Sequence, residues 1–301
     1  MANSTSSMPT VIPLDNPADP RLADYADVKE RQLAAEFGGV GVSGSPQAPH
    51  GKFYAEGKVV LHHLVRCEHQ TLSVLATPAQ VEVNHQDLSR LPASVPVYTL
   101  PHEQMEGVIG FTIHRGLLAV GARRRPRTVE ELLTFASAHG GPLVILEDLS
   151  NHDNIGAIFR NAACLGASGV LLSPRCADPL YRKSLRVSVG LALRVPWAIA
   201  QHWPDDLTQV HNAGFETLAL TPSGSRTLAD AAADRSKGVV RNLALMVGAE
   251  GPGLTPQTMA TARQRVRIPM ASGVDSLNAA TSCAVSLYEL GRTASPPPPL
   301  P

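Results

Sequence analysis

The sequence predicts an α/β protein with two domains, the second of them built around a mostly parallel sheet. At roughly 100 to 200 residues per domain, a chain of 301 residues is expected to divide into two. Short apolar runs alternate with stretches of helical periodicity along most of the chain, which is the pattern of strand–helix–strand units. A charged segment that contains proline, residues 121–127, interrupts this alternation and indicates the boundary between the domains.

The first domain is predicted over residues 21–125, after a disordered tail over residues 1–20. That tail is rich in Ser, Thr, Pro and Asn and has no hydrophobic periodicity. Helical periodicity follows over residues 21–37, then a loop rich in Gly, Ser and Pro over 38–51 and a second helix over 56–65. Three apolar runs predict buried strands at Leu72–Ala76, Val95–Leu100 and Leu117–Val120.

The second domain is predicted over residues 141–292, after a linker over 126–140 that contains a helix at Thr128–His139. Its predicted strands are Leu143–Glu147, Gly169–Leu172, Val195–Ala200, Glu216–Leu220, Leu243–Val247 and Val266–Ile268. Helical stretches at Ile155–Leu165, Tyr181–Val189, Asp205–Ala213 and Leu277–Leu290 lie between or after them. This alternation predicts a mostly parallel sheet that is covered on both faces. The proline-rich segment 293–301 is predicted to be a tail.

Composition argues against several classes of protein. The 26 Lys and Arg residues balance 26 Asp and Glu residues, so bulk charge gives no reason to expect a protein that coats a polyanion or a membrane surface. The 4 Cys residues are far apart, which argues against a disulfide framework and a sulfur-rich metal site. The sequence shows neither a secretory leader nor an apolar run long enough to span a bilayer. We therefore expect a cytoplasmic protein that binds neither a membrane nor a metal ion.

Polar loops follow three of the predicted strands of the second domain. They are residues 147–156, the glycine-rich segment 248–253 and residues 269–278. Because parallel sheets bind ligands at the carboxyl ends of their strands, we expect these three loops to form one composite site.

Each candidate residue in these loops also has a structural interpretation. Asn154 suits the N-cap of the helix that follows it, and this interpretation is favoured for Asn154 taken alone. Arg160 lies in an otherwise apolar helix, so it is predicted to be either part of a buried ion pair or an anion-binding group. Glu250 lies among three glycines, which indicates either a tight turn or a backbone that approaches a ligand closely. Ser276 and Asn278 precede a helix and are suited to cap it.

Several catalytic motifs do not occur in the sequence. An H-E-x-x-H zinc motif, a G-x-S-x-G nucleophile turn and a phosphate-binding P-loop are missing, and the glycines of segment 248–253 do not have the G-x-G-x-x-G spacing of a dinucleotide fingerprint. Local basic clusters remain as candidate contacts to phosphates, although a single run of this kind is more often a solvated face. These clusters are Arg123, Arg124, Arg125 and Arg127; Arg175, Arg182, Lys183 and Arg186; and Arg263, Arg265 and Arg267.

Three segments of the second domain resemble the signature motifs of the SpoU/TrmH branch of the SPOUT RNA methyltransferases. They read NIGAIFRNAACLGA at 154–167, LMVGAEGPGL at 245–254 and IPMASGVDSLN at 268–278. In the first domain, FYAEG at 53–57 and HRGLLA at 114–119 resemble more loosely the substrate-binding domain of the ribosomal L30e/L7Ae fold that precedes the catalytic domain in many members. The pattern departs from the family at Ala279, where Val is usual.

The resemblance implies a fold and an activity beyond what the residues alone predict. It implies a SPOUT-type parallel sheet with a C-terminal trefoil knot, and a homodimer with its active site at the subunit interface. It also implies transfer of a methyl group from S-adenosyl-L-methionine to a ribose 2′-hydroxyl in structured RNA. Ribosomal RNA is favoured over transfer RNA, because a separate first domain suggests recognition of a folded element.

By the same resemblance, Arg160 is the main catalytic residue, supported by Asn154, Glu250, Ser276 and Asn278. We expect Arg160 to orient the nucleotide and stabilise the developing alkoxide, because a guanidinium pKa above about 12 makes arginine an awkward base. The residues implied to bind the cofactor are Leu220, Thr221, Gly248, Gly251, Ile268, Met270, Ser276 and Leu277. Those expected to bind RNA are Arg115, Arg123, Arg124, Arg125, Arg182 and Lys183.

Two other functions compete with this one. An RNA-binding protein on the same fold that has lost turnover would act as an assembly or resistance factor, but it would have no reason to keep all five catalytic candidates. A nicotinamide-dependent oxidoreductase would need G-x-G-x-x-G after the first strand of its sheet. Residues 147–152 follow that strand with the sequence EDLSNH instead, which argues against this function.

Overall fold

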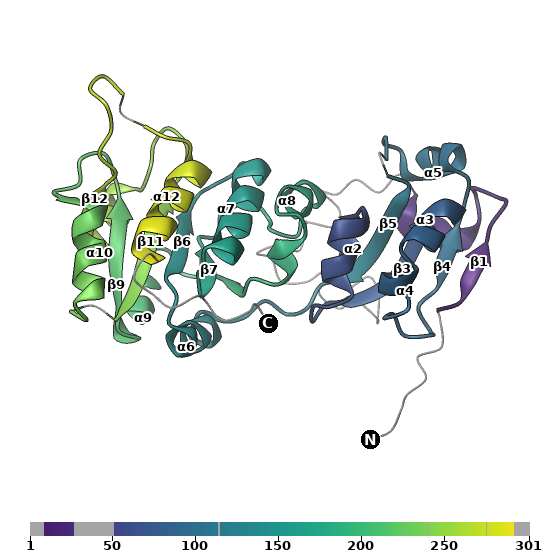
Figure 1. The fold of residues 1–301 in the computed structure, drawn as a ribbon, viewed down its shortest axis with the longest axis horizontal. Helices are drawn as coiled ribbons and strands as arrows, with labels where there is room; N and C mark the ends of the chain where they lie inside the picture. The colour runs from purple at the N-terminus through teal and green to yellow at the C-terminus, as the bar shows by residue number, and fades with distance from the viewer. Residues whose placement is uncertain (1–8, 27–50, 114, 240, 275, 292–301) are drawn as a thin grey trace. The chain divides into compact units, whose positions relative to one another are not determined.

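The computed structural model describes residues 9–26, 51–113, 115–239, 241–274 and 276–291 (Figure 1). These residues form two compact units. Unit 1 contains the described residues up to Arg125 together with Leu180–Leu193, and unit 2 contains Pro126–Pro179 and the described residues from Arg194 onward. The predicted boundaries assign Leu180–Leu193 to the second domain. This assignment differs from the structure, because the helix in this segment packs against a strand of unit 1.

Unit 1 contains a mixed sheet of five strands in the order β1-β4-β3-β5-β2. Strand β4 is parallel to both of its neighbours, whereas β5 is antiparallel to β3 and β2. The strands are β1 (Val11–Pro13), β2 (Lys52–Glu56), β3 (Gln70–Ala76), β4 (Val97–Thr99) and β5 (Leu117–Ala122). Its helices are η1 (Pro20–Tyr25), α2 (Lys58–Leu64), α3 (Pro78–Val83), α4 (His85–Leu88), α5 (His102–Ile109), α8 (Arg182–Val187) and η2 (Leu191–Leu193).

Two predictions for unit 1 are wrong. Residues 1–20 do not all form a tail, because Val11–Pro13 pairs with β4 and the segment after it buries Leu22 and Tyr25. The hydroxyl groups of Tyr25 and Ser73 lie 2.7 Å apart, so a hydrogen bond holds this segment against unit 1. The segment has too few apolar residues to give a hydrophobic periodicity, which is why the sequence did not predict its order. The helix predicted from residue 56 begins at Lys58, after the unpredicted strand β2. Residues 27–50, which include most of the predicted first helix and loop, lie outside the described residues.

Unit 2 contains a sheet of seven strands in the order β10-β12-β9-β11-β6-β7-β8, in which every pairing is parallel. The strands are β6 (Leu143–Glu147), β7 (Gly169–Leu172), β8 (Trp197–Ile199), β9 (Phe215–Leu220), β10 (Arg226–Thr227), β11 (Asn242–Gly248) and β12 (Gln264–Arg267). The chain runs outward from β6 to β8 and then returns to β9 on the far side of β11. The strand order therefore reverses between β6 and β11, which is where ligand sites form in such sheets.

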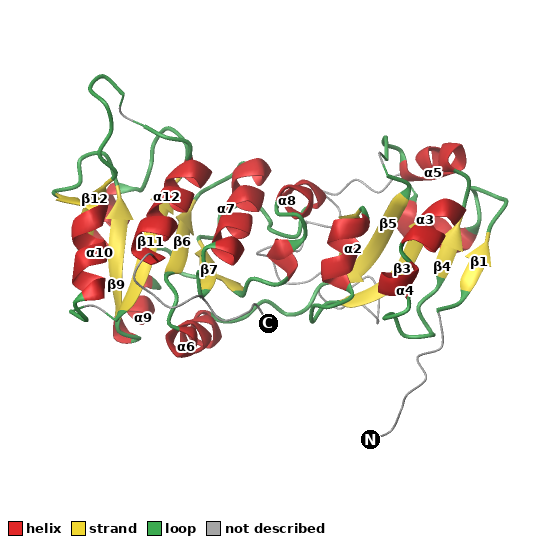
Figure 2. Ribbon diagram, viewed as in Figure 1, coloured by secondary structure: helices red, strands yellow, loops and turns green. Residues whose placement is uncertain are grey.

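Helices cover both faces of this sheet (Figure 2). The core on one face is formed by α6 (Val129–His139) and α9 (Leu207–Asn212), with α11 (Pro256–Thr261) at its margin. On the other face, α10 (Leu228–Ser236) and α12 (Ala279–Gly291) bury Leu228 and Leu290 against β9, β11 and β12. Helix α7 (His152–Cys164) lies beside α12, and the Asn161 side chain donates a 3.0 Å hydrogen bond to the Ala280 carbonyl. This arrangement confirms the predicted α/β class with a covered parallel sheet.

The implied trefoil knot stays a prediction.

No helix within the described ranges is long and apolar enough to cross a membrane.

Candidate functional site

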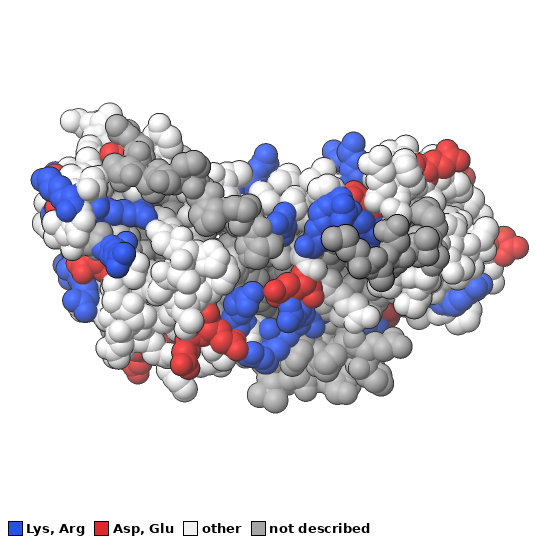
Figure 3. Space-filling model, turned by 60° about the horizontal axis from the view of Figure 1, so that its bottom comes forward, with Lys and Arg blue, Asp and Glu red and all other residues white. Residues whose placement is uncertain are grey.

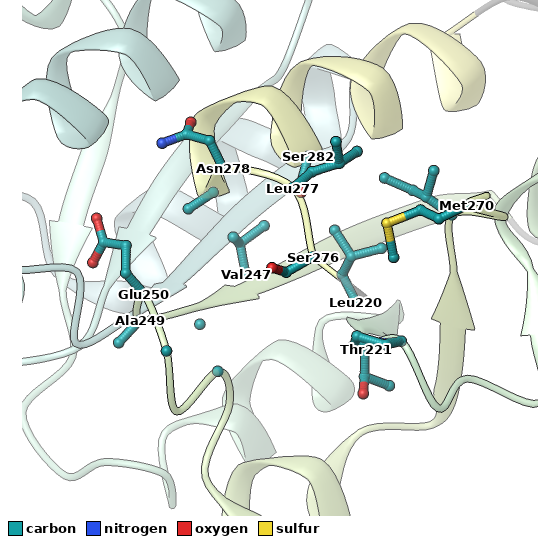
Figure 4. A pocket seen from close by; sticks show the side chains of 16 residues that line it. Leu220, Thr221, Val247, Ala249, Glu250, Met270, Ser276, Leu277, Asn278 and Ser282 are labelled. Atoms are coloured by element: carbon teal, nitrogen blue, oxygen red, sulfur yellow. The ribbon is translucent and has the colours of Figure 1, made fainter. Parts of the chain in front are cut away.

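The candidate site is a cavity of ≈ 400 Å³ in unit 2 (Figure 4). Its walls come from the segments that follow β9, β11 and β12 and from the start of α12. All of the residues predicted to bind the cofactor line this cavity: Leu220, Thr221, Gly248, Gly251, Ile268, Met270, Ser276 and Leu277. The structure thus brings two of the three predicted loops, 248–253 and 269–278, to one cavity, and the segment after β9 takes the place there of the predicted loop 147–156.

The loop after β11 is folded tightly against its own origin. Gly253 N–H donates a 2.9 Å hydrogen bond to the Ala249 carbonyl, and Gly251 and Gly253 have φ angles of 86° and 71°, a region that favours glycine. A Cβ atom on Gly248 would collide with the backbone of Gly253 and Leu254. The glycines therefore serve two purposes, since they permit the turn and keep the cavity wall free of side chains.

Three of the predicted catalytic residues form a hydrogen-bonded chain at this site. Asn278 Nδ2 donates to Asn154 Oδ1 at 2.9 Å, and Asn154 Nδ2 donates in turn to Glu250 Oε1. Asn154 is buried, whereas Glu250 and Asn278 are exposed and line the cavity (Figure 4). These hydrogen bonds fix the Glu250 carboxylate relative to α7 and α12.

The capping predictions have mixed outcomes. Asn154 is not an N-cap, because α7 begins earlier, at His152, where the Asn151 side chain accepts a 2.8 Å hydrogen bond from Asp153 N–H. Asn278 does cap its helix, since its Oδ1 accepts hydrogen bonds from Ala280 N–H at 2.9 Å and Thr281 N–H at 3.2 Å. Asn278 can use its amide group for Asn154 at the same time, so the structural and the functional interpretations hold together.

Arg160 does not line the cavity. It lies on the exposed side of α7, and the structure gives it no hydrogen bond or ion pair to any described residue. The buried ion pair predicted as one alternative is therefore wrong. The reason is that α7 directs Ile155, Ile158 and Phe159 to its buried face, which leaves Arg160 on the outside.

Sequence reasoning missed Glu147, the last residue of β6. Only 1% of Glu147 is exposed, and its carboxylate accepts four hydrogen bonds. Oε1 accepts from Trp203 Nε1 at 2.7 Å, Thr258 Oγ1 at 2.6 Å and Thr255 Oγ1 at 2.9 Å, while Oε2 accepts from Thr255 N–H at 2.8 Å. Thr255 ends the glycine-rich loop, so Glu147 anchors that loop to the central strands.

Asp148, the residue after Glu147, is also held by contacts of its carboxylate. Asp148 has a φ of 57°, and its carboxylate accepts a 2.9 Å hydrogen bond from Ser173 Oγ. It also pairs with Arg175, whose guanidinium lowers the pKa of the Asp148 carboxyl group. Arg175, one of the candidate phosphate contacts, is thus engaged in an ion pair that shapes the turn before α7.

Comparison with known proteins shows the family to which this chain belongs. Residues 141–288 match the model of the SpoU rRNA Methylase family. A Mycobacterium tuberculosis protein described as an uncharacterized tRNA/rRNA methyltransferase is 38% identical over 281 residues, which cover 92% of this chain and 91% of that protein. The chain belongs to the SpoU rRNA methylase family.

Solved structures of similar fold include two members of the SpoU or rRNA methyltransferase class. An AdoMet-bound rRNA methyltransferase from Sinorhizobium meliloti has a TM-score of 0.72 at 22% identity and covers 94% of this chain and 98% of its own. The SpoU methyltransferase AviRb from Streptomyces viridochromogenes has a TM-score of 0.69 at 21% identity, with coverages of 87% and 95%. At these identities the likeness shows the shared fold. The match to the family model begins at residue 141, so the L30e-like character of the first domain stays a prediction.

The arginines predicted to bind RNA differ in their surroundings in this family member. Arg123 is only 8% exposed, and its Nε donates a 3.1 Å hydrogen bond to the Lys52 carbonyl, so it is a structural group of unit 1. Arg124 is exposed and pairs with Glu68. Lys and Arg side chains gather in several patches of the surface, with Asp and Glu side chains beside some of them (Figure 3). Arg125 and Lys183 are exposed. Arg115 lines a second cavity, in unit 1, and Arg182 pairs with Glu56 of that cavity.

Within the described part of the chain, no three His, Cys, Asp or Glu side chains gather in a way that could hold a metal ion.

Proposed function

We propose that this chain is an S-adenosyl-L-methionine-dependent methyltransferase that acts on ribosomal or transfer RNA and modifies a ribose 2′-hydroxyl. The observation that carries the proposal is the ≈ 400 Å³ cavity at the carboxyl ends of β9, β11 and β12, with the chain from Asn278 through Asn154 to Glu250 beside it. Family membership and the AdoMet bound to the Sinorhizobium meliloti protein support the choice of cofactor.

The residues of the cavity fit this cofactor. Its volume is within the range of about 300 to 1,000 Å³ that holds small ligands. Leu220, Ile268, Met270 and Leu277 offer apolar contacts. Gly248 keeps the glycine-rich loop folded along the cavity wall, because a Cβ there would collide with the backbone of Gly253 and Leu254. When bound there, the cofactor would supply an activated, electrophilic methyl group.

The protein must align the ribose hydroxyl for in-line attack and stabilise the oxygen as it loses its proton. The hydrogen-bonded chain holds Glu250 at the cavity wall, where its carboxylate can position the nucleotide. Arg160 carries a permanent positive charge, which suits it to bind the nucleotide and stabilise the developing alkoxide. Of the predicted catalytic residues, Ser276 lines the cavity together with Glu250 and Asn278 (Figure 4).

We further propose that a homodimer completes the site. Arg160 lies outside the cavity of its own chain, which agrees with a role in an active site at the subunit interface. Helix α12, which packs beside α7, exposes two large apolar side chains, Val285 (41% exposed) and Tyr288 (63%). A second copy of the chain would bury these groups. Ribosomal RNA is the preferred substrate in this proposal, because unit 1 offers a separate surface for a folded RNA element.

The test is transfer of label from methyl-tritiated S-adenosyl-L-methionine to total RNA from a strain that lacks the gene, followed by nucleoside analysis. Label in a 2′-O-methylnucleoside, and its loss with Arg160→Ala, is the expected result. Arg90→Ala is the matched control, because Arg90 is an exposed arginine of unit 1 that no described residue pairs with. Label in a methylated base would contradict the ribose as acceptor, and an active Arg160→Lys variant with unchanged RNA affinity would contradict the proposed role of the guanidinium.

A further inference from the structure

Unit 1 contains a second cavity, of ≈ 520 Å³, that is not part of the site described above. One wall is the turn from β2 into α2, with Glu56, Val59 and Val60. The other wall comes from the segment 180–193, which contributes Arg186 and Val189. The two walls pack closely, because a Cβ atom on Gly190 would lie 3.0 Å from the His63 ring and 3.1 Å from Val60 Cα.

Two arginines of this cavity, Arg115 and Arg186, have no acidic partner among the described residues. The Glu56 side chain is only 6% exposed, and its Oε2 accepts a 2.9 Å hydrogen bond from Arg182 Nη1. Arg182 is itself held against Phe111, with its guanidinium carbon 3.7 Å from the centre of the ring. Arg115 and Arg186 line the cavity, are exposed, and have no hydrogen bond or ion pair to the described residues. The cavity therefore has a net positive wall next to a fixed carboxylate.

The backbone at this cavity is strained. Val189 has a φ of 49°, which is a genuine outlier for a β-branched residue. Such conformations cost free energy and are concentrated at ligand sites, where the surrounding structure holds them. Here the tight contact of Gly190 with α2 holds the strained residue in the cavity wall.

We propose that this cavity binds one unpaired nucleotide of the substrate RNA, with its phosphate at Arg115 and Arg186. Arginine is the residue best suited to bind phosphate, through paired N–H groups. Val59, Val60 and Val189 provide an apolar wall for the base, and the free lone pairs of the Glu56 carboxylate accept from its amino group. Adenine, cytosine and guanine offer this carboxylate an amino group, whereas uracil can offer it only its N3–H group, so we expect the cavity to favour a base with an amino group. The inference rests on the proposed function, and it assigns RNA recognition to a segment that lies in the sequence between two strands of the methyltransferase sheet.

The first test measures binding of cytidine 5′-monophosphate, uridine 5′-monophosphate and cytidine to the full chain by calorimetry. S-adenosylhomocysteine is present in excess to occupy the cavity of unit 2. We expect cytidine 5′-monophosphate to bind about tenfold more tightly than cytidine, which lacks the charge-assisted contact of the phosphate, and more tightly than uridine 5′-monophosphate, whose base lacks the amino group. Arg186→Ala and Arg115→Ala should remove the advantage of the phosphate, and Arg90→Ala should not. Equal binding of cytidine and its monophosphate, or an Arg186→Ala variant that titrates like the wild type, overturns the proposal.

The second test measures methyl transfer to RNA with the same variants. Arg186→Ala should raise the KM for RNA about tenfold, leave the KM for S-adenosyl-L-methionine unchanged, and reduce the slope of log affinity against log salt by about one. An RNA KM for Arg186→Ala equal to that of Arg90→Ala contradicts the proposal. A wild-type chain that transfers no methyl group contradicts the proposed function instead, and the calorimetric test still decides whether the cavity binds a nucleotide.

Discussion

Replacement of Glu147 by glutamine should strongly destabilise unit 2. Glutamine keeps one acceptor oxygen for the three donors that now meet Oε1, from Trp203, Thr255 and Thr258. Its amide nitrogen would face Thr255 N–H, which now donates to Oε2, so a donor would oppose a donor. The substitution thus weakens three charge-assisted hydrogen bonds and leaves a buried N–H group without its acceptor.

The expected loss follows from these changes. A hydrogen bond to a charged group contributes about 1 kcal/mol more than one between neutral groups, and an unsatisfied buried donor costs about 1 to 3 kcal/mol. The glutamine side chain avoids burial of a charge, which offsets part of the sum. We therefore expect the free energy of unfolding of unit 2 to fall by about 3 kcal/mol.

Tryptophan fluorescence during urea unfolding measures this loss, because the 2 tryptophans, Trp197 and Trp203, both lie in unit 2. With a slope of about 2 kcal/mol per molar urea, the midpoint should move by about 1.5 M. Glu130→Gln is the control, since Glu130 is exposed on α6 and should change the free energy by no more than about 0.5 kcal/mol. Equal midpoints for the two variants would refute the view that Glu147 anchors the loop.

Three further predictions concern the loop, the hydrogen-bonded chain and a half-buried histidine. Gly248→Ala should weaken S-adenosyl-L-methionine binding at least about tenfold in calorimetry, because its Cβ meets backbone, whereas Gly238→Ala, at a φ of 72° with no atom near its Cβ, should leave affinity unchanged. Asn154→Ala should slow single-turnover methyl transfer about a hundredfold with little change in cofactor affinity, because Glu250 loses its fixed position; an unchanged rate would mean that the chain is only structural. Burial lowers the pKa of His69 from 6.5 to about 4, so the unfolded chain binds more protons between these values and the stability of unit 1 should fall by up to about 3 kcal/mol as pH drops through this range. An NMR titration of the His69 ring that gives a midpoint near 6.5 would contradict this prediction.

Long apolar strands were the most predictable elements of the fold. The bounds of β6 and β7 agree with the prediction, because both strands are buried along their whole length and read as continuous apolar runs. Strands β1 and β10 have only 3 and 2 residues and give no such run. Helix α10 is weakly periodic, although the capping box of Thr227 and Asp230 was a local signal that could have revealed it.

The parts of the candidate site that consist of sequence motifs could be predicted. The parts that depend on contacts between residues far apart in the chain could not. The glycines and polar residues of the loops after β11 and β12 gave part of the cavity lining, whereas no residue of the predicted loop 147–156 lines it. The burial of Glu147 depends on Trp203, Thr255 and Thr258, which are 56, 108 and 111 residues away in the chain, so no local pattern announces it. The placement of Leu180–Leu193 in unit 1 likewise depends on packing and not on its position in the sequence.

The assembly of the polar chain follows from the strand order of unit 2. Asn154 comes from the segment after β6 and Glu250 from the segment after β11, and these two strands are neighbours at the point where the order reverses. Asn278 joins them from the start of α12, 124 residues from Asn154. The hydrogen bonds among Asn278, Asn154 and Glu250 form only when all three segments are in place. A disturbance of the loop at Gly248–Thr255 should therefore move Asn154 and Asn278 as well as the cavity wall. The cavity and the hydrogen-bonded chain of side chains therefore form together, and a variant that loosens the Glu147 anchor should, if the proposed function holds, lose cofactor affinity and methyl transfer in parallel.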